Sequence, residues 1–148
     1  MDNFPIIRVI TKLLIPYILL FAFYVQFHGD FGPGGGFQAG VILAAGLILY
    51  GLVFGLPALQ RVAPPRVIER LIALGVLVYA GTGFATIFLG GKFLDYEALK
   101  HHVLPGWLPE GQHLGIFLVE LGVGITVTSV MTVIFYCFAA REPVDGHG

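Results

Sequence analysis

The sequence predicts an all-α membrane protein, a bundle of four transmembrane helices with a short interfacial helix between the third and fourth spans. Its 148 residues are 57% hydrophobic and only 11% charged, and the mean hydropathy is +0.88. Soluble domains carry about 25% charged residues, so this composition indicates a chain that lies in a bilayer. The apolar runs are long and continuous rather than alternating, which excludes the strands of a membrane barrel.

Four apolar segments are each long enough to cross a hydrocarbon core of about 30 Å. They cover about residues 4–27, 37–57, 69–91 and 113–140. In the first segment, Arg8 and Lys12 are placed to reach the headgroups, and Pro16 is expected to kink the helix or free a carbonyl. No linker, repeat or change of composition divides residues 1–148, which are therefore expected to form one domain.

The connection between the third and fourth spans predicts the short interfacial helix. Its large apolar residues recur at helical spacing, namely Phe93, Tyr96, Leu99 and Val103. His101 and His102 are adjacent, so a helix would point them in different directions. A metal site there would need further ligands, and solvated or interfacial histidines are the simpler interpretation.

The distribution of Lys and Arg predicts the orientation in the cell membrane. Six of these residues fall at the N-terminus, in the second connection and near the C-terminus, namely Arg8, Lys12, Arg61, Arg66, Arg70 and Arg141. Only Lys92 and Lys100 fall on the other side. Both termini are therefore expected in the cytoplasm, and the first connection is expected to face outward.

Glu120 is the strongest single candidate for chemistry, because it is the one charged residue of the fourth segment. A carboxylate at this depth must face protein or water, pair with a cation, or keep its proton. His113, Gly124 and Thr128 fall near the same helical face at i−7, i+4 and i+8. Two interpretations stay open: an ion or proton path along this stripe, or a hydrogen bond from Glu120 to a neighbouring subunit that fixes helix packing.

The first connection is a polar, glycine-dense loop between two apolar segments. It contains His28 and Asp30, followed by the run Pro33, Gly34, Gly35, Gly36 and Phe37. Pro33 and the glycines favour a tight turn into the second helix. Close packing, ion or proton access past His28 and Asp30, and anion binding by free amides all remain open. A phosphate-binding loop is excluded because no Gly-Lys-Ser/Thr follows.

Two motifs in this order resemble the MrpB family, also called MnhB, of subunits of multisubunit sodium/proton antiporters. The first is His28-Gly29 followed by Pro33-Gly34-Gly35-Gly36-Phe37 and Gly40, with Asp30 where the family has a second histidine. The second is Glu120-Leu121-Gly122-Val123, with glutamate where the family has aspartate. The similarity extends over the whole chain, including its size and its four spans.

The resemblance implies a small integral-membrane subunit of a monovalent cation (Na⁺)/proton antiporter. Its partners would be the other membrane subunits, the lipid bilayer, and Na⁺ and H⁺ as the transported ions. The alternative is a non-catalytic scaffold in a redox-driven relative of the membrane-bound hydrogenase type. The residues themselves indicate no enzyme, no cofactor and no metal site, since Cys137 is the one cysteine and no nucleophile–base set appears. No basic cluster indicates nucleic-acid binding.

Overall fold

The computed structural model describes residues 4–29, 34–88 and 111–140, and for 111–114 it describes the backbone alone. Every element in these residues is a helix: α1 (Pro5–His28), α2 (Gly36–Phe54), α3 (Leu56–Val62), α4 (Pro65–Phe88) and α6 (Gly111–Ala139). Four stretches are long and apolar enough to cross a membrane, namely Pro5–His28, Gly36–Phe54, Pro65–Phe88 and Gly115–Ala139. The predicted all-helical class with four spans is confirmed.

The ends of these helices follow from prolines and one glycine. Pro5 and Pro65 begin α1 and α4, where a missing N–H costs nothing. Gly55 ends α2 with φ 92°, a left-handed conformation that favours glycine. The second span therefore stops at Phe54, short of the predicted residue 57, and the third starts at Pro65, ahead of the predicted residue 69.

The described residues contain one short helix in addition to the four spans. α3 occupies the connection between the second and third spans, for which the sequence analysis predicted no helix. The interfacial helix predicted between the third and fourth spans, with His101 and His102, lies outside the described residues. α1 remains helical through Pro16.

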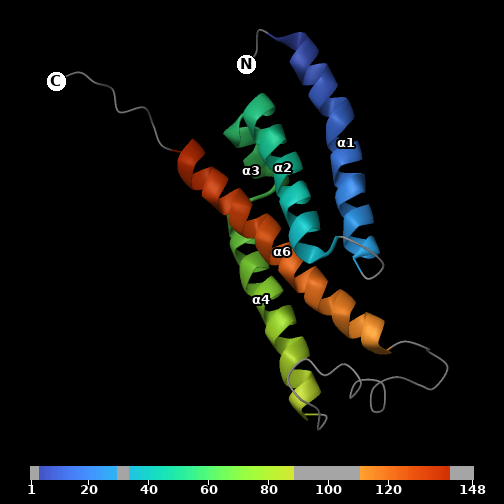
Figure 1. Ribbon diagram of the computed structural model, residues 1–148. Helices are drawn as coiled ribbons and strands as arrows, with labels where there is room; N and C mark the ends of the chain where they lie inside the picture. Colours follow the sequence, from blue (N-terminus) through green and yellow to red (C-terminus); the bar gives the residue numbers. More distant parts are fainter. Residues whose placement is uncertain (1–3, 30–33, 89–110, 141–148) are drawn as a thin grey trace.

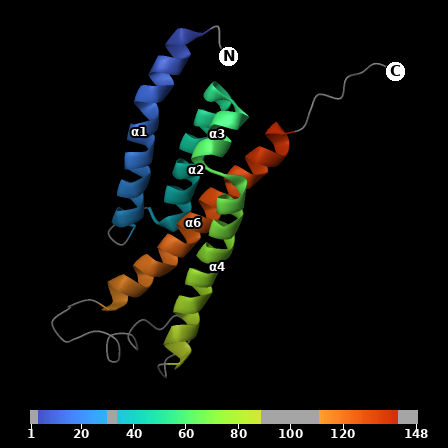
Figure 2. The same ribbon diagram turned by 180° about the vertical axis from the view of Figure 1, so that it is seen from behind.

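α6 is the central helix of the molecule. Figure 1 shows it crossing obliquely between α2 and α4, with α1 beside α2, and Figure 2 shows the same order from behind. α2 runs parallel to α6, with Gly40 opposite Gly124. α4 runs antiparallel, with Gly75 opposite Gly122. α1 meets α6 near its own C-terminal end, where the rings of Phe27 and Phe117 stack at 5.5 Å.

Small residues set the distance between these helices. A methyl group on Gly40 would lie 2.8 Å from the carbonyl oxygen of Gly124, and one on Gly122 would lie 2.9 Å from that of Gly75. Glycine is therefore required on both faces of α6 for the backbones to approach this closely. Membrane helices gain stability from such packing because lipid tails offer no hydrophobic driving force between helices.

A small apolar cluster joins α3 and α4 to the C-terminal part of α6. It consists of Leu59, Ala63, Ile68 and Tyr136, all buried. The Tyr136 hydroxyl donates a hydrogen bond of 2.5 Å to the carbonyl oxygen of Ala63. This bond satisfies both polar groups inside an apolar environment, as buried polar groups require.

Candidate functional site

Glu120 lies on α6 directly against the turn that joins α1 to α2. A methyl group added to Gly29 would lie 2.5 Å and 2.9 Å from the two carboxylate oxygens of Glu120. One added to Gly35 would lie 3.1 Å from carboxylate oxygen Oε1. Residues on both sides of the turn therefore touch the carboxylate, and only residues without a side chain leave room for it.

The backbone of Glu120 is held as tightly as its side chain. A methyl group on Gly36, the first residue of α2, would overlap the carbonyl oxygen of Glu120. Gly35 precedes it with φ 113°, which a residue with a side chain rarely adopts. Gly35 and Gly36 thus begin α2 and let its first turn pack against α6.

This arrangement has an electrostatic consequence. The carboxylate lies beside Gly35, which is the N-cap of α2. The N-terminus of a helix carries a partial positive charge and unpaired N–H groups. A negative charge on Glu120 therefore lies at the end of α2 that favours it.

The stripe that continues from Glu120 faces α2. Gly124 lies opposite Gly36 and Gly40. The Thr128 hydroxyl oxygen lies 2.7 Å from the carbonyl oxygen of Gly124 and 3.1 Å from that of Gly40, and it donates its hydrogen to these carbonyls. Thr128 thereby links α6 to α2.

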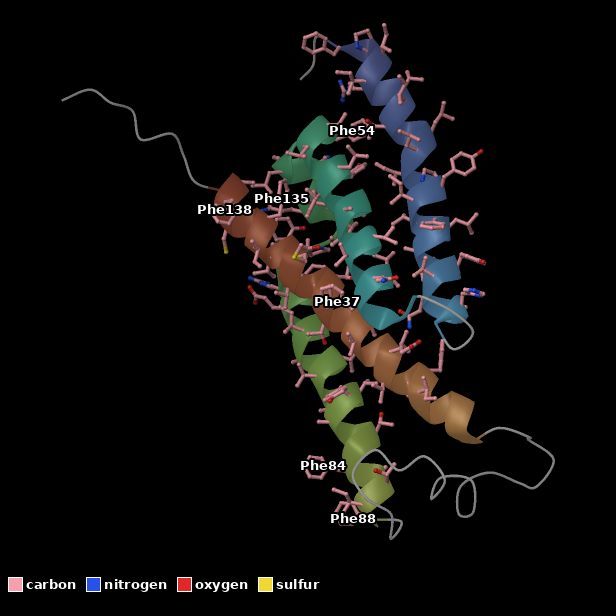
Figure 3. All side chains as sticks on the ribbon, viewed as in Figure 1. Phe37, Phe54, Phe84, Phe88, Phe135 and Phe138 are labelled. Carbon is pink, nitrogen blue, oxygen red and sulfur yellow. The ribbon has the colours of Figure 1, made fainter. Side chains whose placement is uncertain are left out.

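The structure describes only some of the other predicted residues. His28 ends α1, next to Gly29, and its ring stacks on Tyr24 at 5.3 Å. Phe37 points away from the turn and is 63% exposed (Figure 3). Asp30 and Pro33 lie outside the described residues, and His113 is described only as a backbone position in the first turn of α6. Gly34 packs against α1, where an added methyl group would lie 3.2 Å from the carbonyl oxygen of Val25.

Gln26 is a buried polar residue that the sequence analysis missed. Only 6% of it is exposed, and its side-chain oxygen lies beside Gly124, where a methyl group would meet it at 2.8 Å. Its amide nitrogen Nε2 has no hydrogen-bond partner among the described residues. A glutamine three residues before a polar connection is expected at the edge of a membrane span, where a polar side chain can reach water. Its position in the sequence therefore did not indicate that it is buried.

Together these features define a class: a multi-pass, all-helical membrane protein with one ionisable side chain held between its last described helix and a glycine turn. The family model described as "domain related to MnhB subunit of Na⁺/H⁺ antiporter" matches residues 6–133. The chain therefore belongs to this family, whose members are transporter components.

Individual relatives agree with this assignment. A protein of Staphylococcus haemolyticus named antiporter subunit mnhB2 is 35% identical over 143 residues, covering 95% of this chain and 98% of the relative. A Na⁺/H⁺ antiporter subunit of Alkalihalophilus pseudofirmus is 30% identical over 133 residues, covering 85% and 90%. An mnhB2 protein of Staphylococcus aureus strain Newman is 34% identical over 135 residues, covering 90% and 92%.

Proposed function

We propose that this chain is a small subunit of a multisubunit monovalent cation (Na⁺)/proton antiporter, and that Glu120 lies on an ion or proton path through it. Membership of the MnhB family supports the first part. The close approach of Gly29 and Gly35 to the Glu120 carboxylate carries the second. The chain acts with other membrane subunits and catalyses no covalent reaction of its own.

The physical argument starts from the cost of a carboxylate within a membrane span. Ionisable side chains at such positions face the protein interior or a water-filled cavity, and they mark ion and proton pathways. Broken or starting helices inside transporters supply backbone groups that bind ions beside such residues. Here the ionisable side chain is that of Glu120, and the backbone groups of a starting helix are those of the first turn of α2, which lies beside it.

The remaining members of the path are assigned by their positions. His28 adjoins Gly29, and Asp30 follows it in the sequence, so these two residues would guide ions or protons to the carboxylate. Thr128 follows two helical turns along α6, and His113 precedes Glu120 by about two turns. The transported ions would be Na⁺ and H⁺.

Exchanging Gly29 for alanine tests this proposal. Gly29 has φ −56° and ψ −33°, which alanine adopts without strain, so the added methyl group acts through Glu120 and the adjoining Gly35 backbone. We expect Gly29→Ala to lower Na⁺-driven proton exchange in everted vesicles by about tenfold, the effect of roughly 1.4 kcal/mol in an activation barrier. The tagged variant should still co-purify with the other membrane subunits.

Gly34→Ala is the matched control, because its methyl group faces Val25 rather than Glu120. This variant should exchange ions at the wild-type rate. Equal exchange by both variants would remove the carboxylate contact from the mechanism. Failure of the wild-type chain to co-purify with any membrane subunit would contradict the assignment as a subunit.

We also infer that residues 1–148 form one domain with both termini in the cytoplasm. Arg8 and Lys12 lie 5.4 Å and 5.7 Å from the ring centre of Phe54, so the basic residues of α1 lie at the same end of the molecule as the C-terminus of α2.

Gln60 on α3 is exposed near this end. With Cys137 replaced by alanine, Gln60→Cys should react with a membrane-impermeant maleimide in everted vesicles and not in intact cells; the reverse pattern would invert the orientation.

A further inference from the structure

The four long helices form the wall of an apolar groove, which adjoins the proposed ion path at Thr128. Its volume is about 250 Å³, and every one of α1, α2, α4 and α6 contributes to its wall. Most of its wall consists of large apolar side chains, among them Phe23, Phe27, Leu43, Leu47, Ile68 and Ile125. A cavity of about 150 Å³ lined by such residues stays dry and holds a benzene molecule, so this groove has room for a substantial apolar ligand.

One hydrogen-bond donor in the groove wall has no partner. Gln26 lines the groove and is 94% buried, and its Nε2 donates to no atom of the described residues. An unsatisfied amide in an apolar environment is costly, roughly 1–3 kcal/mol. The free N–H therefore indicates a ligand that brings a hydrogen-bond acceptor, such as a carbonyl oxygen.

The groove has the dimensions of a single hydrocarbon chain. It follows α6 from Leu121 to Ser129, which is about 12 Å at 1.5 Å per residue. A transmembrane helix of another subunit is about 10–12 Å wide with its side chains. A groove of about 250 Å³ that is about 12 Å long is too narrow to hold such a helix. The acyl chains of lipids are narrow enough for the groove, and they surround the membrane-spanning part of the protein.

The position of Gln26 Nε2 predicts which end of an acyl chain would lie beside it. Gln26 lies two residues before the end of α1, close to the polar turn, whereas Leu47 and Ile68 lie toward the other side of the membrane. In a phospholipid, the ester carbonyls lie at the edge of the hydrocarbon core and the acyl chain runs inward from them. We propose that the groove binds one acyl chain of a membrane phospholipid, and that Gln26 Nε2 donates a hydrogen bond to its ester carbonyl.

Photolabelling of the reconstituted complex tests the site. The probe is a phosphatidylethanolamine with a diazirine on one acyl chain, and the vesicles receive an excess of unlabelled lipid shortly before irradiation. We expect adducts on groove residues such as Leu43 and Ile125 to survive this chase. Adducts on Leu13 and Leu20, which are exposed on the outer face of α1, should disappear because lipids there exchange freely.

Gln26→Met keeps the approximate volume of the side chain and removes the donor. Retained groove adducts should fall about fivefold, the effect of one neutral hydrogen bond, while Gln60→Met, at an exposed position of α3, leaves them unchanged. Ile125→Phe, which fills the groove, should abolish them. Wild-type groove adducts that vanish as fast as those on α1, or retention that is unaltered in Gln26→Met, would overturn the proposal.

Discussion

Replacing Glu120 with glutamine is expected to reduce Na⁺-driven proton exchange to below about a tenth of the wild-type rate, in keeping with the loss of a positioned proton-transfer group. Glutamine has nearly the same shape, so it fits the space between Gly29 and Gly35. It carries no charge and exchanges no proton at neutral pH, so the packing is kept while the ionisable function is lost. The measurement is the quenching of a pH-sensitive dye in everted vesicles after Na⁺ is added.

Glu69→Gln provides the matched control, because Glu69 is exposed near the start of α4. Its exchange rate should equal that of the wild type. The amount of assembled complex must be equal in all three preparations, as measured by co-purification in mild detergent. Wild-type exchange by a fully assembled Glu120→Gln complex would leave Glu120 with the packing role alone.

Gly36→Ala is expected to disrupt the fold itself. The added methyl group would overlap the backbone carbonyl of Glu120, and a backbone carbonyl cannot rotate away as a side chain can. α2 and α6 would have to separate, at a cost of about 3 kcal/mol, which is the upper end of ordinary overpacking. The expected result is loss of the chain from the purified complex and a lower temperature of aggregation in detergent.

Gly46→Ala on the same helix is the control for this substitution. There the methyl group would lie 3.2 Å from a terminal carbon of Leu19 and 3.4 Å from Ile18 Cγ2, both side-chain atoms that can shift. Gly46 lies in the helix interior, where alanine gains about 1 kcal/mol of helix propensity, whereas Gly36 is the first residue of α2 and gains less. A stability difference well above about 1 kcal/mol therefore reports the contact with α6. Equal stability of the two would show that the α2–α6 contact tolerates a side chain at Gly36.

Composition and hydropathy were sufficient to predict the four spans, because a bilayer requires long apolar helices and little else from the sequence. It was harder to predict which face of each helix packs against protein and which faces lipid. In a membrane, the residues that face lipid are as apolar as those that face protein, so periodicity does not separate them. Gln26 shows the consequence: its burial depends on Gly124 of a helix far along the chain, which no local pattern reveals.

The candidate site was predicted in parts but not as a unit. The sequence indicated both the glycine run and Glu120, and left open whether the turn folds toward that carboxylate. The contact depends on the close approach of α2 to α6, which three residues without side chains permit: Gly36, Gly40 and Gly124. Glycines are frequent throughout this chain, so the sequence alone could not show which of them lie at the contact.

The central position of α6 also affects how the protein is made. Thr128 of α6 bonds to Gly40 of α2 across 88 positions of the sequence. At a synthesis rate of about 5–20 residues per second, roughly 4 to 18 seconds pass between the appearance of these two residues at the ribosome. By the end of that interval both α2 and α4 have been made, while the helix that separates them in the finished protein is still incomplete. The glycine faces that later receive α6 are therefore exposed to lipid, or to the membrane insertion machinery, before the protein folds.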